Sequence, residues 1–183
     1  MSKSDVEKEL EGKGDFVQIA YLTEILEEKV LIDVRKFIYF KLAEIYERKG
    51  MLKDAAKMFD RIALNSIAFS EKIKHYVKEA ELYIKAGAFE KVNEAMKKAM
   101  NQANTIEKQD IYFAIRDFYK KQAEVYEKEM KRNHAVRIYE KLLEMDITDL
   151  EKQEIKEKLL ELYEKLGKLK EYFVLKHSIG DKK

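Results

Sequence analysis

The sequence predicts an all-α fold of repeated helical hairpins, and three observations lead to that prediction. The chain of 183 residues contains no proline, and it is rich in the helix formers Lys, Glu and Leu. One pattern recurs four times, as LAEIYERKGMLKDAAKMFD from Leu42, AELYIKAGAFEKVNEAM from Ala80, AEVYEKEMKRNHAVRIY from Ala123 and LELYEKLGKLKEYFVLK from Leu160. Its tyrosines, Tyr46, Tyr83, Tyr126 and Tyr163, lie 37, 43 and 37 residues apart, a period typical of helical repeats.

Composition limits the classes of function. The 37 basic and 35 acidic residues give a net charge of +2, so the surface has no general attraction for nucleic acid or an anionic membrane. The absence of cysteine excludes disulfides, thiolate metal sites and a cysteine nucleophile. No apolar run is long enough to span a membrane, and the N-terminus lacks a signal region. We therefore expect a cytoplasmic protein, with a Lys and Glu content that resembles hyperthermophile usage.

The N-terminal half is expected to hold a tail and five helices. Residues 1–14 carry charges on both sides of Leu10 and end in a glycine-rich stretch, which predicts a flexible tail. Asp15 and Asp33 are candidate N-caps of the first two helices. Gly50 and Gly87 suit the left-handed backbone that follows a helix. The predicted helices cover residues 16–28, 33–49, 53–64, 70–86 and 88–103.

The C-terminal half is expected to hold four more helices. Tyr112, Tyr119 and Tyr126 keep a seven-residue spacing, which predicts one long helix over residues 106–131 that begins after Thr105. Thr148 and Glu151 form a capping-box pattern. The remaining predicted helices cover residues 133–145, 149–166 and 168–179, and a polar tail follows at 180–183. With nine helices joined by short turns, neighbours are expected to pack antiparallel in one domain over residues 15–179.

The recurring segments resemble the tetratricopeptide repeat. The family's pattern of large, small and turn residues falls in the first segment on Tyr39, Leu42, Ala43, Tyr46, Gly50, Ala55 and Phe59. Later segments match it less completely, and Met130 stands where the third would have its turn glycine. The resemblance covers residues 36–179. It implies a right-handed superhelix of the degenerate, long-repeat type, because the spacing exceeds the family's usual period of about 34 residues.

In such a superhelix the first helices of the hairpins line a concave groove. The position two residues before each repeat tyrosine is a glutamate in all four segments; we call these the ladder glutamates, and they are Glu44, Glu81, Glu124 and Glu161. Further groove positions hold Glu47, Glu127, Glu164, Phe40, Val77 and Ile84. The resemblance therefore implies a scaffold or adaptor whose acidic groove binds a basic or amphipathic segment of a partner protein.

An alternative needs no ligand. Each ladder glutamate lies four residues before a cation, the favourable order for an ion pair within a helix. Those cations are Arg48, Lys85, Lys128 and Lys165. Such a pair stabilises a helix by roughly 0.2–0.5 kcal/mol, so the glutamates are equally explained as solvated pairs.

Other functions are less favoured. The histidines His75, His134 and His177 lack the spacing of metal ligands, and no phosphate-binding loop or nucleophile motif occurs, so we expect neither an enzyme nor a cofactor. Basic pairs are interleaved with acidic residues, which disfavours RNA binding without excluding it. The last helix is apolar over much of its girth. It either caps the repeats or pairs with another copy, so a homodimer or a larger assembly is the main alternative function.

Overall fold

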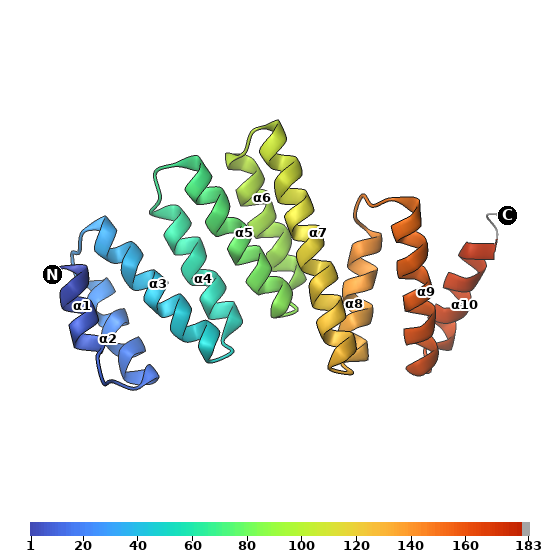
Figure 1. Ribbon diagram of the computed structural model, residues 1–183, viewed down its shortest axis with the longest axis horizontal. Helices are drawn as coiled ribbons and strands as arrows, with labels where there is room; N and C mark the ends of the chain where they lie inside the picture. Colours follow the sequence, from blue (N-terminus) through green and yellow to red (C-terminus); the bar gives the residue numbers. More distant parts are fainter. Residues whose placement is uncertain (181–183) are drawn as a thin grey trace. The chain divides into compact units, whose positions relative to one another are not determined.

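The structure is a computed structural model that describes residues 1–180. In this part the chain forms helices joined by short turns (Figure 1). Within these residues the prediction of an all-α fold is confirmed. The predicted tail at 180–183 begins at the last residue of the final helix, and residues 181–183 lie outside the described part. The described helices are α1 (Lys3–Leu10), α2 (Asp15–Glu27), α3 (Ile32–Arg48), α4 (Leu52–Leu64), α5 (Phe69–Lys85), α6 (Phe89–Gln102), α7 (Thr105–Lys128), α8 (Arg132–Leu143), α9 (Asp149–Lys165) and α10 (Leu169–Gly180).

The chain divides into two compact units, whereas the sequence predicted one domain over residues 15–179. Unit 1 is Met1–Ile115 and unit 2 is Arg116–Lys183, so the division falls within α7. In unit 1, the consecutive helices α2 and α3, α3 and α4, α4 and α5, and α5 and α6 pack against each other. In unit 2, α9 packs against both α8 and α10.

The N-terminal segment is a helix, which corrects the prediction of a flexible tail. Ser2 and Asp5 form a capping box in which the Ser2 hydroxyl accepts from the Asp5 amide and the Asp5 carboxylate accepts from the Ser2 amide. Val6 and Leu10 lie on one side of α1 and are buried in a cluster with apolar residues of α2 and α3. These two apolar residues, one turn apart, pack α1 against the apolar surface of α2 and α3.

The same backbone turn follows every repeat tyrosine. The amide five residues on donates to the tyrosine carbonyl, at 2.8 Å after Tyr46, 2.9 Å after Tyr83, 2.8 Å after Tyr126 and 2.9 Å after Tyr163. This is the bond that closes a Schellman turn, in which the residue before the donor adopts a left-handed backbone. Glycine occupies that position in three hairpins, and Met130, with φ of 57°, occupies it in the fourth. The repeat predicted from tyrosine spacing is thus a repeat of one chain-reversing turn.

Three of the four repeat tyrosines, Tyr83, Tyr126 and Tyr163, are buried, and Tyr46 is half-buried. Tyr76 and Tyr119, which lie two turns before Tyr83 and Tyr126, are also buried. The hydroxyl of Tyr163 reaches Glu140 at 2.8 Å and donates to its carboxylate. A buried ring with a hydrogen-bonded hydroxyl at its edge fills the interface between hairpins without an unsatisfied polar atom.

A buried ion cluster joins three helices of unit 1. The Lys98 ammonium of α6 donates to Asp60 of α4 at 2.6 Å and to Glu79 of α5 at 3.0 Å. Glu79 is only 3% exposed, and burial raises its pKa to about 7 although Lys98 lies beside it. Two carboxylates share one ammonium here, so ionising Glu79 leaves one negative charge uncompensated in the core.

Replacing Met130 by glycine is expected to stabilise unit 2 by about 1 kcal/mol, because a side chain on a left-handed residue strains the backbone by roughly that amount. Met130 is largely exposed, so little packing is lost. Urea unfolding of the native protein, Met130→Gly and the control Met130→Ala measures the effect. A glycine variant no more stable than the alanine variant would show that the turn is not strained.

Stability is also expected to depend on the protonation of Glu79. The unfolded chain releases this proton near pH 4.5 and the folded chain near pH 7, so the folded state binds more protons in between. The free energy of unfolding should therefore fall by up to about 3 kcal/mol from pH 5 to pH 8. Glu79→Gln should lose this decline and Glu90→Gln, an exposed control on α6, should keep it. Urea unfolding across that range tests this, and equal slopes for Glu79→Gln and the native protein would contradict it.

Candidate functional site

The four ladder glutamates are not equivalent in the structure. Glu81 and Glu161 form the expected pairs four residues on, with Lys85 at 2.5 Å and with Lys165 at 3.4 Å. Glu44 instead meets Lys41 at 3.7 Å, and no partner of Glu124 is found within residues 1–180. The alternative of solvated helix pairs therefore describes two of the four positions, and Glu44 and Glu124 are left as the exposed carboxylates of interest.

Arg48, the expected partner of Glu44, is used elsewhere. Its guanidinium hydrogen-bonds the Asp15 carboxylate of α2, which also meets Lys49 at 3.0 Å. Asp15 was predicted as the N-cap of the first helix, but Gly14 holds that position. The carboxylate instead anchors α2 to the end of α3.

Two other groove glutamates bridge neighbouring first helices rather than facing solvent alone. Glu47 of α3 meets Lys78 of α5 at 3.5 Å, and Glu127 of α7 meets Lys158 of α9 at 3.0 Å. Glu164 is exposed, while Phe40 and Val77 are half-buried. Ile84 is fully buried, so it packs inside its own unit and offers no contact to a partner, contrary to expectation.

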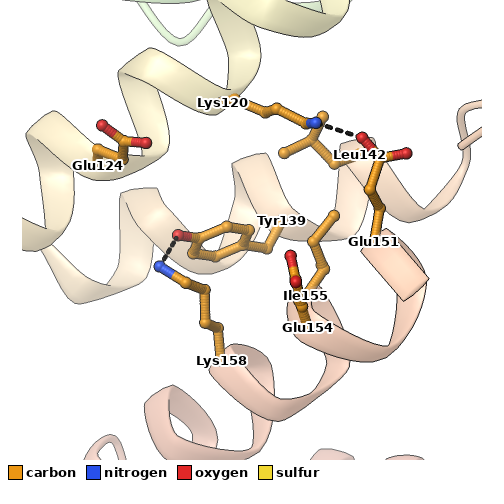
Figure 2. A pocket seen from close by; sticks show the side chains of 8 residues that line it. All are labelled: Lys120, Glu124, Tyr139, Leu142, Glu151, Glu154, Ile155 and Lys158. Carbon is orange, nitrogen blue, oxygen red and sulfur yellow. Dashed lines mark hydrogen bonds and ion pairs between the residues drawn. The ribbon is translucent and has the colours of Figure 1, made fainter. Parts of the chain in front are cut away.

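Glu124 lies at a cavity of about 150 Å³ within unit 2. Figure 2 shows the side chains that line it, which come from α7, α8 and α9. Its apolar lining consists of the buried residues Tyr139, Leu142 and Ile155. Its polar lining consists of Lys120, Glu124, Glu151, Glu154 and Lys158.

The Tyr139 hydroxyl links the three helices at one side of the cavity. It donates to Glu127 of α7. It accepts from the Lys158 ammonium of α9 at 3.0 Å (Figure 2). Burial, together with the hydrogen bond to Glu127, raises the pKa of Tyr139 to about 12. The phenol therefore stays protonated at neutral pH and serves as a fixed donor and acceptor rather than as a nucleophile.

A second link lies across the cavity. Lys120 of α7 donates to Glu151 of α9 at 2.5 Å (Figure 2). Glu151 also completes the predicted capping box with Thr148, which is confirmed. The Lys120 hydrogen bond and the capping amide hold the pKa of Glu151 at about 2. Both lysines of the lining are thus occupied by carboxylates of the chain.

Two carboxylates at the cavity have no such partner. Glu124 and Glu154 are exposed, and neither forms a hydrogen bond or ion pair with any residue of the described part. The cavity therefore combines an apolar lining with the negative charges of Glu124 and Glu154 at its edge. Those two features suit a group that is apolar in part and carries a positive charge nearby.

Glu44 lines a comparable space in unit 1. A cavity of about 290 Å³ is bounded by residues of α1, α2 and α3. Its lining includes Glu7 and Glu11, from α1 and the turn after it, together with Glu44. Lys41 meets both Glu7 and Glu44 at 3.7 Å, so α1 brings additional carboxylates to the side of α3 that carries the first ladder glutamate.

Unit 2 repeats unit 1 at an offset of 80 residues. The tyrosine spacing already contains this offset, because Tyr126 follows Tyr46, and Tyr163 follows Tyr83, by 80 residues. The bridge between Glu47 and Lys78 recurs as that between Glu127 and Lys158. The bridge between Lys36 and Glu71, at 2.5 Å, recurs as that between Arg116 and Glu151, at 3.9 Å. Equal spacing alone could not reveal which side chains meet, because that depends on the packing of neighbouring first helices.

The three histidines differ in their surroundings. His75 is buried, with its ring 5.3 Å from that of Phe40 and 6.0 Å from that of Phe59, and burial lowers its pKa. His134 and His177 are exposed. Residues 1–180 contain no group of three His, Cys, Asp or Glu side chains placed to hold a metal ion.

None of the described helices combines the length and the apolar character needed to cross a membrane. A comparison with known protein families finds no family model that matches this chain, and a comparison with curated proteins finds no match either. The chemistry of the chain's own surfaces is therefore what points to a function.

Proposed function

We propose that this protein is a non-enzymatic scaffold whose hairpins bind a basic or amphipathic segment of a partner protein. The observation that carries the proposal concerns Glu44 and Glu124. These two ladder glutamates lack an ion pair with the cation four residues on, and both border a cavity. Glu124 forms no ion pair within residues 1–180, and Glu44 shares the single ammonium of Lys41 with Glu7, so both carboxylates can accept a cation brought by a partner.

The surroundings of both residues support the same chemistry. Each cavity places apolar side chains next to carboxylates, Leu10 and Ile45 in unit 1 and Leu142 and Ile155 in unit 2. An amphipathic helix or extended segment presents apolar and basic side chains side by side, which is the complementary arrangement. The resemblance of the segments to tetratricopeptide repeats, whose members bind peptides along their first helices, agrees with this proposal.

Binding is expected to follow the charge of the peptide and to require these two carboxylates. The native protein should bind a helix-forming peptide of lysine, leucine and alanine, and should not bind the same peptide with glutamate in place of lysine. Glu44→Gln should weaken binding at the cavity of unit 1 and Glu124→Gln binding at the cavity of unit 2, each about fivefold, since a lost charge-assisted contact contributes on the order of 1 kcal/mol. Isothermal titration at moderate ionic strength measures both.

A matched control changes the same charge elsewhere. Glu90→Gln with Glu171→Gln removes one exposed carboxylate from α6 and one from α10, and it should bind the basic peptide as the native protein does. Equal weakening in this control and in the Glu44→Gln and Glu124→Gln variants would reduce the interaction to general charge attraction. That result would contradict binding sites at Glu44 in unit 1 and at Glu124 in unit 2.

The terminal helix supports a second candidate function, membership of a homodimer or larger assembly. Leu169, Phe173 and Val174 of α10 are each more than half exposed. Apolar side chains gathered on one terminal helix are typical of a surface that another chain covers.

If α10 pairs with a second copy, the mass from light scattering should rise with protein concentration. Replacing Phe173 and Val174 by glutamate should then hold the protein at the monomer mass, because the charges would have to be buried. A native protein that keeps the monomer mass over the whole concentration series would rule out the homodimer.

A further inference from the structure

The unit 2 cavity has a counterpart in unit 1 that is filled by the chain itself. At the offset of 80 residues, four of its lining residues correspond to an aromatic cluster of unit 1. Lys120 corresponds to Phe40, Tyr139 to Phe59, Leu142 to Ile62 and Ile155 to His75. The contacts around both sites agree, since Lys78 lies 5.9 Å from the centre of the Phe59 ring and Lys158 lies 5.4 Å from that of Tyr139.

In unit 1 a phenyl ring occupies the interface. The Phe40 ring centre lies 6.0 Å from that of Phe59 and 5.3 Å from that of His75, both in edge-to-face geometry. Phe59 and His75 are buried, and Phe40 is half-buried above them. This cluster shows what group the interface between neighbouring hairpins accommodates, which is a planar ring placed between helices.

In unit 2 the ring is missing and the space remains. Lys120, which replaces Phe40, extends to Glu151, and Ile155, which replaces His75, carries no ring. The resulting cavity of about 150 Å³ has the volume at which apolar cavities in proteins, of about 150 Å³, accept a benzene molecule. Tyr139 presents the ring against which a guest would pack.

The charge beside the site also differs between the units. Glu154 of unit 2 corresponds to Lys74 of unit 1, so a basic residue beside the filled site becomes an acidic one beside the open site. Together with Glu124, this makes the surroundings of the open site negative. A guest that carries a positive charge next to its ring is therefore favoured.

We propose that the cavity of unit 2 binds an aromatic side chain of a partner segment, in the place that Phe40 fills in unit 1, with a basic residue of the same segment beside Glu124 and Glu154. This assignment rests on the proposed function and names the residue that anchors the partner. The carboxylates predict only a positive charge in the partner, whereas the Phe40 ring at the corresponding place in unit 1 predicts that the bound side chain is aromatic. The cavity thus supplies the pocket for one anchoring residue, as in other peptide-binding surfaces.

The test fills the cavity with the chain's own ring. Lys120→Phe recreates the residue of unit 1, and Lys120→Met removes the same charge and the same bond to Glu151 without adding a ring. The probe is a pentapeptide with phenylalanine between two pairs of lysines, compared with the same peptide carrying alanine at its centre. Titration of the full chain is followed by NMR through the methyl groups of Leu142 and Ile155.

The native protein should bind the phenylalanine peptide about tenfold or more tightly than the alanine peptide, as burial of a phenyl ring implies. Lys120→Met should keep that preference and Lys120→Phe should abolish it. Thermal unfolding should show Lys120→Phe to be at least as stable as Lys120→Met, which excludes loss of binding through misfolding.

Two outcomes would overturn the inference. If the native protein binds both peptides alike, and binding still requires Glu44 and Glu124, the scaffold function stands and the aromatic pocket is wrong. If Lys120→Phe keeps the preference for phenylalanine, the ring binds somewhere other than this cavity. Failure of every basic peptide to bind would overturn the pocket and the proposed function together.

Discussion

Two side-chain bridges between the first helices of neighbouring hairpins are the interaction that recurs in both units. In unit 1, Lys36 and Glu71 meet near the start of α3 and α5, and Glu47 and Lys78 meet further along these helices. Salt bridges of this exposure contribute little to stability individually, but they show which turns of α3 and α5 lie opposite each other. The same two bridges recur between α7 and α9. Once the register is fixed, the residues between the bridges can fill the interface or leave it open.

The fold was predictable because its determinants are local. Chain reversal after each repeat tyrosine needs only a left-handed residue and a five-residue backbone bond, and glycine marks three of the four turns. Capping by Thr148 and Glu151 is equally local and was found from the sequence. The helix α1 was missed because its signal is weak by itself. Val6 and Leu10 become informative only when the apolar face of α2 and α3 is known to be unfilled.

The site was predictable only in part, because it depends on which side chains meet across helices. Counting positions from the repeat tyrosines identified Glu124 as a surface residue next to a cavity, yet it also selected Ile84, which is fully buried. The partners of the ladder glutamates could not be read from a four-residue spacing, since Asp15 of another helix competes for Arg48. The cavity itself has no sequence motif. From the sequence, the cavity could be expected only by aligning Lys120 with Phe40. That alignment depends on knowing that both units contain the same interface.

The open interface of unit 2 also has a thermodynamic consequence. Empty space in a protein interior reduces stability in proportion to its volume, because the atoms around it lose dispersion contacts. In unit 1 the Phe40 ring makes these contacts, whereas in unit 2 Lys120 stands at the same position and no ring replaces it. The two copies of the interface therefore differ in how completely they are packed. A molecule that enters the cavity of unit 2 would supply the dispersion contacts that its lining residues lack. A molecule that binds in this cavity would therefore also raise the resistance of unit 2 to unfolding.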